Sequence, residues 1–404
     1  PRVFIIFQKN GYAYLRIIME NKVIFWVLVL LQFFELIIFK DHFWYYLLTL
    51  LLLCFLFKGY LYQSSLKKYI VAYVVFIFVS AISSNYFNKQ PVVGTFVESY
   101  PYLGLLSFFL LPSFQINQSE LIEKGIVKLA IVFCICYLMQ YVLYPVILFS
   151  GASTTSFEAG IIRIRMAGSA LSFFLYLWGL TKFLEMREGK FLLISLFALL
   201  VPLMMGFRSL LFLVVICTVI LIIKVEGLSL KIVFYSSLMV ILGFAMSFLP
   251  FIRDKIDSMI ERQDSGQSFS NSDYIRFVEY DYYLDNVFTN PLERFWGGGA
   301  PIYGTSYYKE IMLAFEKLLY WNDWGIIGLS WIIGVIPVGI LIFLVLRCCL
   351  FRLNSHYFYL KLLLLLLLLG SIATSMEIYR NGNLIIVGLI MYLMEQNKYE
   401  NLSN

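Results

Sequence analysis

Charged residues are scarce in this sequence. Only 14% of its 404 residues are Asp, Glu, Lys or Arg, whereas 61% are hydrophobic. Soluble domains carry about 25% charged residues, so the composition excludes a water-soluble enzyme. Apolar runs as long as a bilayer is thick recur along the chain, and they are continuous, as in Leu362–Leu369, rather than alternating. This pattern predicts an all-α polytopic membrane protein and excludes a β-barrel.

Histidine and cysteine are also rare. The two histidines, His42 and His356, lie far apart, and none of the six cysteines falls in the long polar segment 251–324. Zinc sites and Ser-His-Asp catalysis are therefore excluded, and no disulfide framework is expected. The sequence also lacks an Asp-x-Asp cluster, which metal-dependent sugar-nucleotide transferases favour. The nearest equivalent is Glu279 with Asp281, and the side chains of these two residues would point to different faces of a helix. We expect no metal and no cofactor.

The apolar runs predict twelve transmembrane helices of about 17–25 residues each. Nine of them fall within residues 1–250 and three within residues 325–404, on either side of the hydrophilic segment 251–324. Their approximate ranges are 23–39, 43–57, 69–84, 95–112, 126–149, 166–186, 191–206, 209–223, 231–250, 325–347, 358–376 and 383–395.

Lysine and arginine are unevenly distributed between the two sides of this topology. With the N-terminus in the cytoplasm, eighteen of them fall on the cytoplasmic side, whereas the short outer loops hold six. Such an excess is the positive-inside signal, so both termini are expected in the cytoplasm. Segment 251–324 then lies on the periplasmic or extracellular face. It is too long for a simple connection and is expected to carry function.

The outer segment is acidic and rich in aromatic residues. It holds twelve acidic and seven basic residues, and many of its remaining residues are Tyr, Trp or Phe. The aromatic rings suit stacking on sugar faces, and they equally suit a belt at the level of the lipid headgroups.

Two helices are expected within this segment. The first, at about 274–288, places Arg276 and Tyr280 on one face, one turn apart. The second lies at about 308–321. Residues 290–299 between them form a turn-rich link that ends in a glycine run, which predicts local flexibility.

Arginine gathers on the outer side of the predicted topology. The cytoplasmic side has thirteen Lys and five Arg, whereas the outer side has five Lys and eight Arg. Because arginine recognises phosphate bidentately, this cluster predicts a phosphate-bearing lipid held at the outer leaflet. The outer arginines are Arg163, Arg165, Arg208, Arg253, Arg262, Arg276, Arg294 and Arg380.

Several of these arginines also have simpler interpretations. Arg208 lies between two apolar runs, where insertion costs roughly 2.5–3.5 kcal/mol, so it needs a partner, a wet cavity or a path to the headgroups. Arg163 and Arg165 share a side only if the backbone is extended, and either could bind ordinary lipid headgroups. Arg380 could simply pair with Glu377.

Such a cluster suits glycosyl transfer from a pyrophosphate-linked lipid. Guanidinium groups can stabilise the charge of the leaving group without a metal, and a carboxylate can deprotonate the acceptor hydroxyl. The predicted catalytic residues are Arg276 and, as the base, one of Glu310, Glu316 and Asp323. The predicted substrate-binding residues are Arg163, Arg165, Arg208, Tyr280, Arg294 and Arg380.

Four short motifs follow one another between about residues 160 and 345. In chain order they are Arg165-Met-Ala-Gly168-Ser, Gly206-Phe-Arg208-Ser209, Arg276 followed by Asn290-Pro291 and Gly297-Gly298-Gly299, and Asp323-Trp-Gly325-Ile-Ile-Gly328-Leu. Together they resemble the O-antigen polymerases of the Wzy type and the related O-antigen ligases. Phe207 departs from the pattern, because that family usually has Ser at this position.

The resemblance implies a GT-C-like membrane glycosyltransferase of the bacterial cytoplasmic (inner) membrane with its active site facing outward. It would move a growing glycan from undecaprenyl pyrophosphate onto a lipid-linked repeat unit, in O-antigen, capsule or other polysaccharide synthesis. Its expected partners are the lipid-linked oligosaccharide donor and acceptor, membrane lipid and a protein that regulates chain length, with no nucleic acid. Arg165, Arg208 and Arg276 would contact the pyrophosphate.

Two alternatives stay open. An O-antigen ligase would carry a histidine shortly before the Gly325-Ile-Ile-Gly328 motif, and segment 251–324 has none. A transporter or flippase of lipid-linked sugars would place polar residues at mid-span in several helices, whereas the basic residues here lie at span ends and in the outer segment.

Overall fold

A computed structural model describes residues 49–54, 56, 62–113, 118–149, 153–156, 162–206, 208–227, 253, 275–372, 377–380 and 382–400. The spans expected at 23–39 and 231–250, and most of that at 43–57, lie outside these residues, as does Arg262. The side chains of Arg163, Arg165 and Arg208 are also outside the described part.

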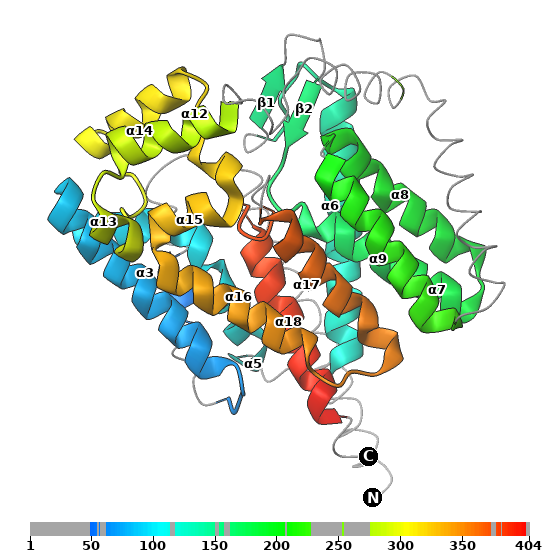
Figure 1. The fold of residues 1–404 in the computed structure, drawn as a ribbon. Coiled ribbons are helices and arrows are strands. Elements are labelled where there is room, and N and C mark those ends of the chain that lie inside the picture. The colour runs from blue at the N-terminus through cyan, green and yellow to red at the C-terminus, as the bar shows by residue number, and fades with distance from the viewer. Residues whose placement is uncertain are drawn as a thin grey trace, which may run out of the picture.

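The described chain is helical except for one two-stranded antiparallel ribbon (Figure 1). Its elements, in chain order, are α3 (Lys67–Asn88), α4 (Val92–Glu98), η1 (Tyr100–Phe109), α5 (Leu110–Ser113), α6 (Ser119–Val142), β1 (Ser153–Ser156), β2 (Ile162–Arg165), α7 (Ala170–Met186), α8 (Gly189–Met205), α9 (Arg208–Glu226), α12 (Ile275–Tyr282), η2 (Tyr283–Val287), α13 (Pro291–Trp296), α14 (Ser306–Glu316), η3 (Trp321–Trp324), α15 (Gly325–Ile333), α16 (Val335–Cys349), η4 (Ser355–Tyr357), α17 (Phe358–Gly370) and α18 (Asn383–Glu400).

Three helices of the described part are long and apolar enough to cross a membrane, namely α3, α6 and α9 from Ser209 onward. A fourth candidate is the pair formed by α4 and residues 100–112, which is bent by 68°. The helices at Gly189–Met205, Val335–Cys349 and Ser355–Gly370 are apolar but shorter. These helices agree with membrane association, while the count of twelve spans stays a prediction.

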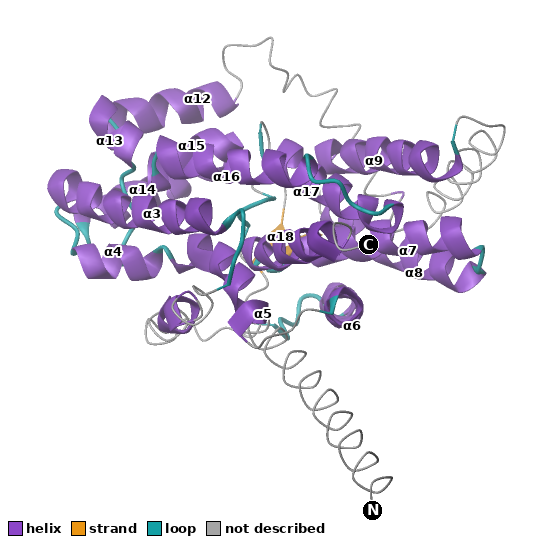
Figure 2. Cartoon of the chain, turned by 90° about the horizontal axis from the view of Figure 1, so that it is seen from below, coloured by secondary structure: helices purple, strands orange, loops and turns teal. Residues whose placement is uncertain are grey.

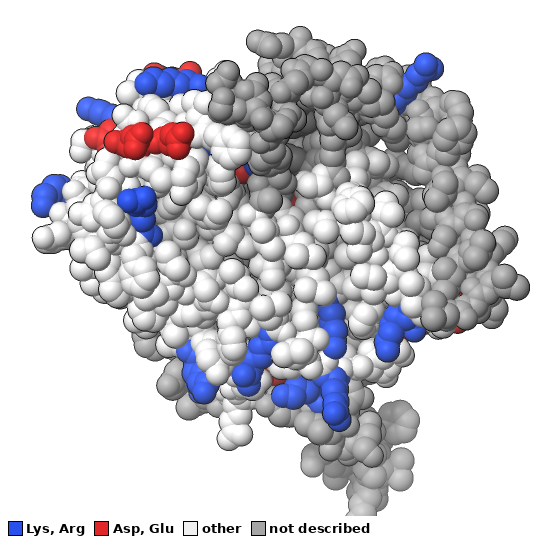
Figure 3. Space-filling model, in the orientation of Figure 1, with Lys and Arg blue, Asp and Glu red and all other residues white. Residues whose placement is uncertain are grey.

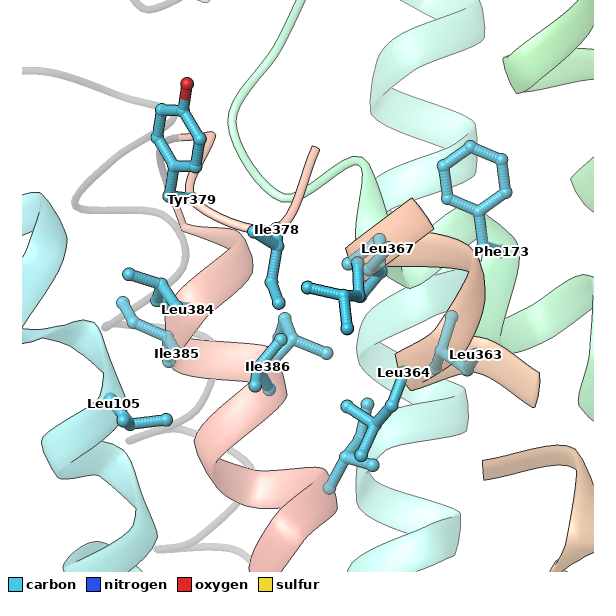
Figure 4. Close-up of a cluster of buried hydrophobic side chains, with 14 of the residues drawn as sticks. Leu105, Phe173, Leu363, Leu364, Leu367, Ile378, Tyr379, Leu384, Ile385 and Ile386 are labelled. Carbon is cyan, nitrogen blue, oxygen red and sulfur yellow. The ribbon is translucent and has the colours of Figure 1, made fainter. Parts of the chain in front are cut away.

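Helix α18 is the centre of the core. Seen from below, it lies between the group of α3, α4 and α16 and the group of α7, α8 and α9 (Figure 2). Every residue from Leu384 to Met394 is buried. Leu363, Leu364 and Leu367 of α17 gather beside Ile386 (Figure 4). A helix that is apolar all round belongs either in a protein core or in a membrane, and the burial of this whole stretch of α18 by its neighbours shows that it lies in the core.

One face of the molecule has a broad uncharged belt. On the face shown in Figure 3, Lys, Arg, Asp and Glu lie mainly at the upper left and along the lower edge, with one basic side chain at the upper right and the uncharged belt between them. Such a belt suits contact with hydrocarbon.

Glycine ends the helix that precedes Arg208. Helix α8 stops at Gly206, whose φ of +70° is the left-handed conformation common after a helix, and α9 begins at Arg208. A break between the spans expected at 191–206 and 209–223 is therefore present.

The residues expected to form one span at 325–347 instead form two helices, α15 and α16, separated by Gly334. Gly334 has a φ of +94°, and a Cβ there would lie 2.6 Å from the carbonyl oxygen of Trp296. The close approach of α13 therefore requires a glycine and breaks the helix at this point.

The glycine run at 297–299 is not a flexible link, as its composition had suggested. The backbone N–H groups of Gly298 and Gly299 donate to the carbonyl oxygens of Trp331 and Ile332, over 2.7 and 2.8 Å. The run is thus fixed against the end of α15, and it is glycine-rich because two backbones approach each other there.

Candidate active site

Arg276 joins the outer segment to the beginning of α15. Its Nη1 donates to the carbonyl oxygen of Asp323 at 2.6 Å, and the indole Nε1 of Trp324 donates back to the carbonyl oxygen of Arg276 at 3.0 Å. The two bonds hold α12 against η3, so the guanidinium of Arg276 has a fixed position above the first turn of α15.

The turn into α15 depends on Gly325 and Gly328. Gly325 has a φ of +53°, and a Cβ at Gly328 would lie 1.9 Å from the carbonyl oxygen of Trp321. The Gly-x-x-Gly spacing in this motif therefore has a steric cause, because η3 folds directly onto the first turn of the helix.

Glu279 lies beneath this turn, three residues after Arg276 on α12. Its side chain is buried, with 1% exposure, and Oε1 accepts a hydrogen bond from the Tyr320 N–H at 3.2 Å. Its Oε2 has no hydrogen-bond partner among the described residues. Burial and, second, the charge of Asp323 raise the pKa of Glu279 to about 7, against the opposing effects of the Tyr320 N–H and Arg276.

Glu279 was not among the site residues predicted from the sequence. It had been considered only with Asp281 as a metal pair, whereas its spacing of three from Arg276 places the two on the same helical face. That spacing is the signal that could have found it. Glu279 and Arg276, together with the nearby Asp323 of η3, form a group suited to proton transfer beside a bound anion.

Aromatic rings pack beside this group. The Tyr280 ring lies 4.9 Å from Trp324 and 5.8 Å from Trp331, centroid to centroid. The Tyr283 hydroxyl donates to the carbonyl oxygen of Leu319 at 3.0 Å. Tyr280 is half-buried, so its ring serves the packing between α12 and α15 and leaves one part accessible.

Arg380 belongs to a second, buried polar group. Its Nη2 lies 2.7 Å from Oε1 of Glu377, and the two side chains are 7% and 0% exposed. The Ser169 hydroxyl donates to Oε2 of Glu377 at 3.0 Å, and Asn383 Nδ2 donates to the Ser169 oxygen at 2.9 Å. The simpler interpretation of Arg380, a pair with Glu377, is therefore what the structure contains.

The two groups are joined through the first turn of α15. The Tyr379 hydroxyl donates to the carbonyl oxygen of Gly325 at 2.5 Å, and the Ile326 N–H donates to that of Ser371 at 2.8 Å. Figure 4 shows the Tyr379 hydroxyl directed away from the apolar core.

The chain around Arg165 and Arg208 lies next to the second group. Ser169, which binds Glu377, is four residues after Arg165 at the end of β2. Leu210, two residues after Arg208, contacts the position of Gly370, where a Cβ would lie 2.6 Å from Leu210 and 3.7 Å from Glu377. Short stretches of chain therefore connect both arginines to residues that contact Glu377 or the Gly370 position beside it.

Strand β2 explains how Arg163 and Arg165 can act together. It pairs with β1 so that Arg163 lies opposite Thr155 and Arg165 opposite Ser153. Positions two apart on a strand share a face, and Ile164 between them is fully buried. The extended backbone that the pair requires is therefore present.

The remaining predicted residues lie on α13 and α14. Glu310 and Glu316 are exposed on α14. Arg294 is half-buried on α13, beside Glu293, whose Oε1 accepts from Asn88 Nδ2 at 2.7 Å. Burial, followed by the nearby charge of Glu310, raises the pKa of Glu293. Of the three carboxylates proposed as the base, Asp323 is the one that the fold brings to Arg276.

No group of three or more His, Cys, Asp or Glu side chains able to hold a metal ion occurs in the described part of the chain. No protein-family model matches this chain, and no curated protein matches it either. The fold and its apolar helices define a helical protein associated with a membrane.

Proposed function

We propose that this chain is a membrane glycosyltransferase that polymerises lipid-linked glycan repeat units at the outer face of the bacterial cytoplasmic membrane. The observation that carries the proposal is the junction at the start of α15. There Arg276 is bonded to Asp323, Glu279 lies buried beneath them, and Tyr379 links the junction to the segment that holds Arg380.

In this proposal the acceptor hydroxyl attacks the anomeric carbon of the donor sugar. A carbon–oxygen bond forms, the bond from that carbon to the pyrophosphate oxygen breaks, and the electron pair leaves on the pyrophosphate. The hydroxyl proton passes to Asp323. Arg276, together with Arg165 and Arg208, neutralises the charge of the undecaprenyl pyrophosphate as it leaves, as guanidinium groups do elsewhere for phosphate leaving groups.

We propose Asp323 as the base because it is half-buried, its main-chain carbonyl binds Arg276 and its charge acts on Glu279, whereas Glu310 and Glu316 face solvent on α14. A solvated carboxylate with no fixed neighbour has neither the orientation nor the electrostatic setting that general base catalysis requires.

The finer topology is part of the same proposal: twelve spans, both termini in the cytoplasm, and segment 251–324 outside, in a GT-C-like arrangement. A cysteine-free background gives a direct test. A cysteine at Tyr303, which is 72% exposed, should react in intact cells with a maleimide that cannot cross membranes. A cysteine in place of Lys190, at the start of α8, should react only after the cells are opened. The opposite result would reverse the topology.

The functional test is the banding pattern of surface polysaccharide in cells with and without the gene. Loss of the gene should collapse a ladder to a product with one repeat unit. Polymer that persists on the carrier lipid would indicate a ligase instead. Repeat units trapped on the cytoplasmic face would indicate transport.

Site variants then test the residues. Arg276→Ala, Arg208→Ala and Asp323→Asn should each abolish the ladder at normal protein levels in the membrane. Glu316→Gln, which removes an exposed carboxylate from the same outer segment, is the matched control and should retain it. A full ladder in both arginine variants would refute the proposal that these arginines stabilise the leaving pyrophosphate.

A further inference from the structure

A separate cluster of cations lies at the end of the molecule opposite α13. Helix α3 runs from Lys67 to Asn88, where Asn88 bonds to Glu293 of α13. Helix α16 starts beside Trp296 of α13 and ends at Cys349. The beginning of α3 and the end of α16 therefore share the end opposite α13.

Two cations converge there on one aromatic ring. Lys68 Nζ lies 5.0 Å, and Arg347 Cζ 5.3 Å, from the centroid of the Tyr69 ring. The Phe343 ring lies 4.8 Å from Tyr69 and 5.9 Å from the Arg347 Cζ, so it joins the two helices at this point.

This cluster has no acidic partner among the described residues. Neither Lys68 nor Arg347 forms an ion pair there. The carboxylate nearest the start of α3, Glu395, is fully buried and accepts hydrogen bonds from Ser64 and Ser65. Two like charges held about one ring, neither of them in an ion pair among the described residues, create a site of positive potential.

An apolar surface continues from the cations toward the middle of the molecule. On α16, Phe343 is 42% and Leu346 48% exposed, and on the adjacent α3, Val75 is exposed as well. The spacing from Lys68 to Val75 is two helical turns, so both lie on one face of α3. A positive site at the end of an apolar strip is complementary to a phospholipid, whose negative phosphate is followed by apolar acyl chains.

We propose that Lys68, Tyr69 and Arg347 bind the phosphate of an anionic phospholipid whose acyl chains lie along Phe343 and Leu346. Basic side chains near a membrane surface attract anionic lipids with roughly a fivefold gain in affinity each. This site is distinct from the proposed active site and does not depend on the proposed reaction.

The test uses the full-length protein in detergent and measures lipid binding by native mass spectrometry. Phosphatidylglycerol is titrated against phosphatidylethanolamine. The variant Lys68→Gln/Arg347→Gln should lose about 25-fold in affinity for phosphatidylglycerol, with little change for phosphatidylethanolamine. Leu346→Asn, which leaves both charges in place, should weaken binding of the diacyl lipid as well.

The matched control is Lys224→Gln/Lys398→Gln. Each of these lysines also lies over one aromatic ring, Phe358 or Phe351, and in the described part of the chain no second cation lies over either ring. The control removes the same charge and should stay within about threefold of the unmodified protein. Equal losses in both double variants would overturn the proposal, as would unchanged binding in Lys68→Gln/Arg347→Gln. Displacement of the lipid by soluble glycerol phosphate would also overturn it, because the site would then take the phosphate alone.

Discussion

Replacing Glu279 with Gln should remove a pH-dependent loss of stability from the outer segment. A carboxyl whose pKa rises from its ordinary value of 4.5 to about 7 favours the neutral form in the folded protein. The shift corresponds to about 3 kcal/mol of cost when the buried group ionises. Gln is neutral at every pH, has nearly the same shape, and keeps an oxygen that can accept the Tyr320 N–H.

The direction of the effect follows from proton binding. Between about pH 4.5 and pH 7 the folded state holds a proton on Glu279 that the unfolded state has released. The stability that the neutral carboxyl provides is therefore complete below about pH 4.5 and is lost as the pH rises through about 7. At pH 8 the full cost is present in the unmodified protein and absent from Glu279→Gln.

Amide hydrogen exchange is a suitable measurement, because it reports local opening of α12 and η3 without requiring the whole membrane protein to unfold reversibly. After correction for intrinsic exchange rates, peptides covering 275–282 and 319–324 should lose about 100-fold in protection between pH 5 and pH 8 in the unmodified protein. In Glu279→Gln this change should be largely absent. Glu316→Gln, an exposed control, should behave as the unmodified protein does. A Gln variant that keeps the full pH dependence would refute the assignment of the buried charge to Glu279.

Two further substitutions test the packing that supports the junction. Gly328→Ala should lower the melting temperature in detergent and cost about 1–3 kcal/mol, because its Cβ would overlap the carbonyl oxygen of Trp321. Its control, Gly339→Ala, has open space around it and should be neutral or slightly stabilising. Equal melting temperatures for the two variants would contradict the steric explanation. Glu377→Ala should cost about 3–5 kcal/mol, because it leaves the charge of Arg380 buried without its carboxylate, and a variant that melts normally would show that the pair is dispensable.

Local signals predicted the parts of this fold that depend on neighbouring residues. Hydropathy and length located α3, α6 and α9, and the gap between two apolar runs located the break between α8 and α9. The pairing of Arg380 with Glu377 was foreseen as an alternative from their spacing of three. In each case the residues concerned are within one or two helical turns of each other, so the chain itself brings them together.

The features that were missed depend on contacts between distant segments. The glycine run at 297–299 looks flexible in isolation, and its rigidity comes from hydrogen bonds to residues 331 and 332. The break at Gly334 has the same origin, since only the approach of α13 excludes a side chain there. Hydrophobicity alone predicted one span at 325–347 because α15 and α16 are both apolar.

Glu279 shows why the site could be predicted only in part. The sequence contains twenty-five acidic residues, and helical spacing alone places many of them near an arginine. What distinguishes Glu279 is its burial under η3 and its position beside Asp323, more than forty residues later in the chain. These two conditions arise because Gly325 and Gly328 allow η3 to fold onto the start of α15. The steric requirement of the glycines and the electrostatic setting of the carboxyls therefore have one cause. A substitution that opens the turn, such as Gly328→Ala, should also return the pKa of Glu279 toward its ordinary value.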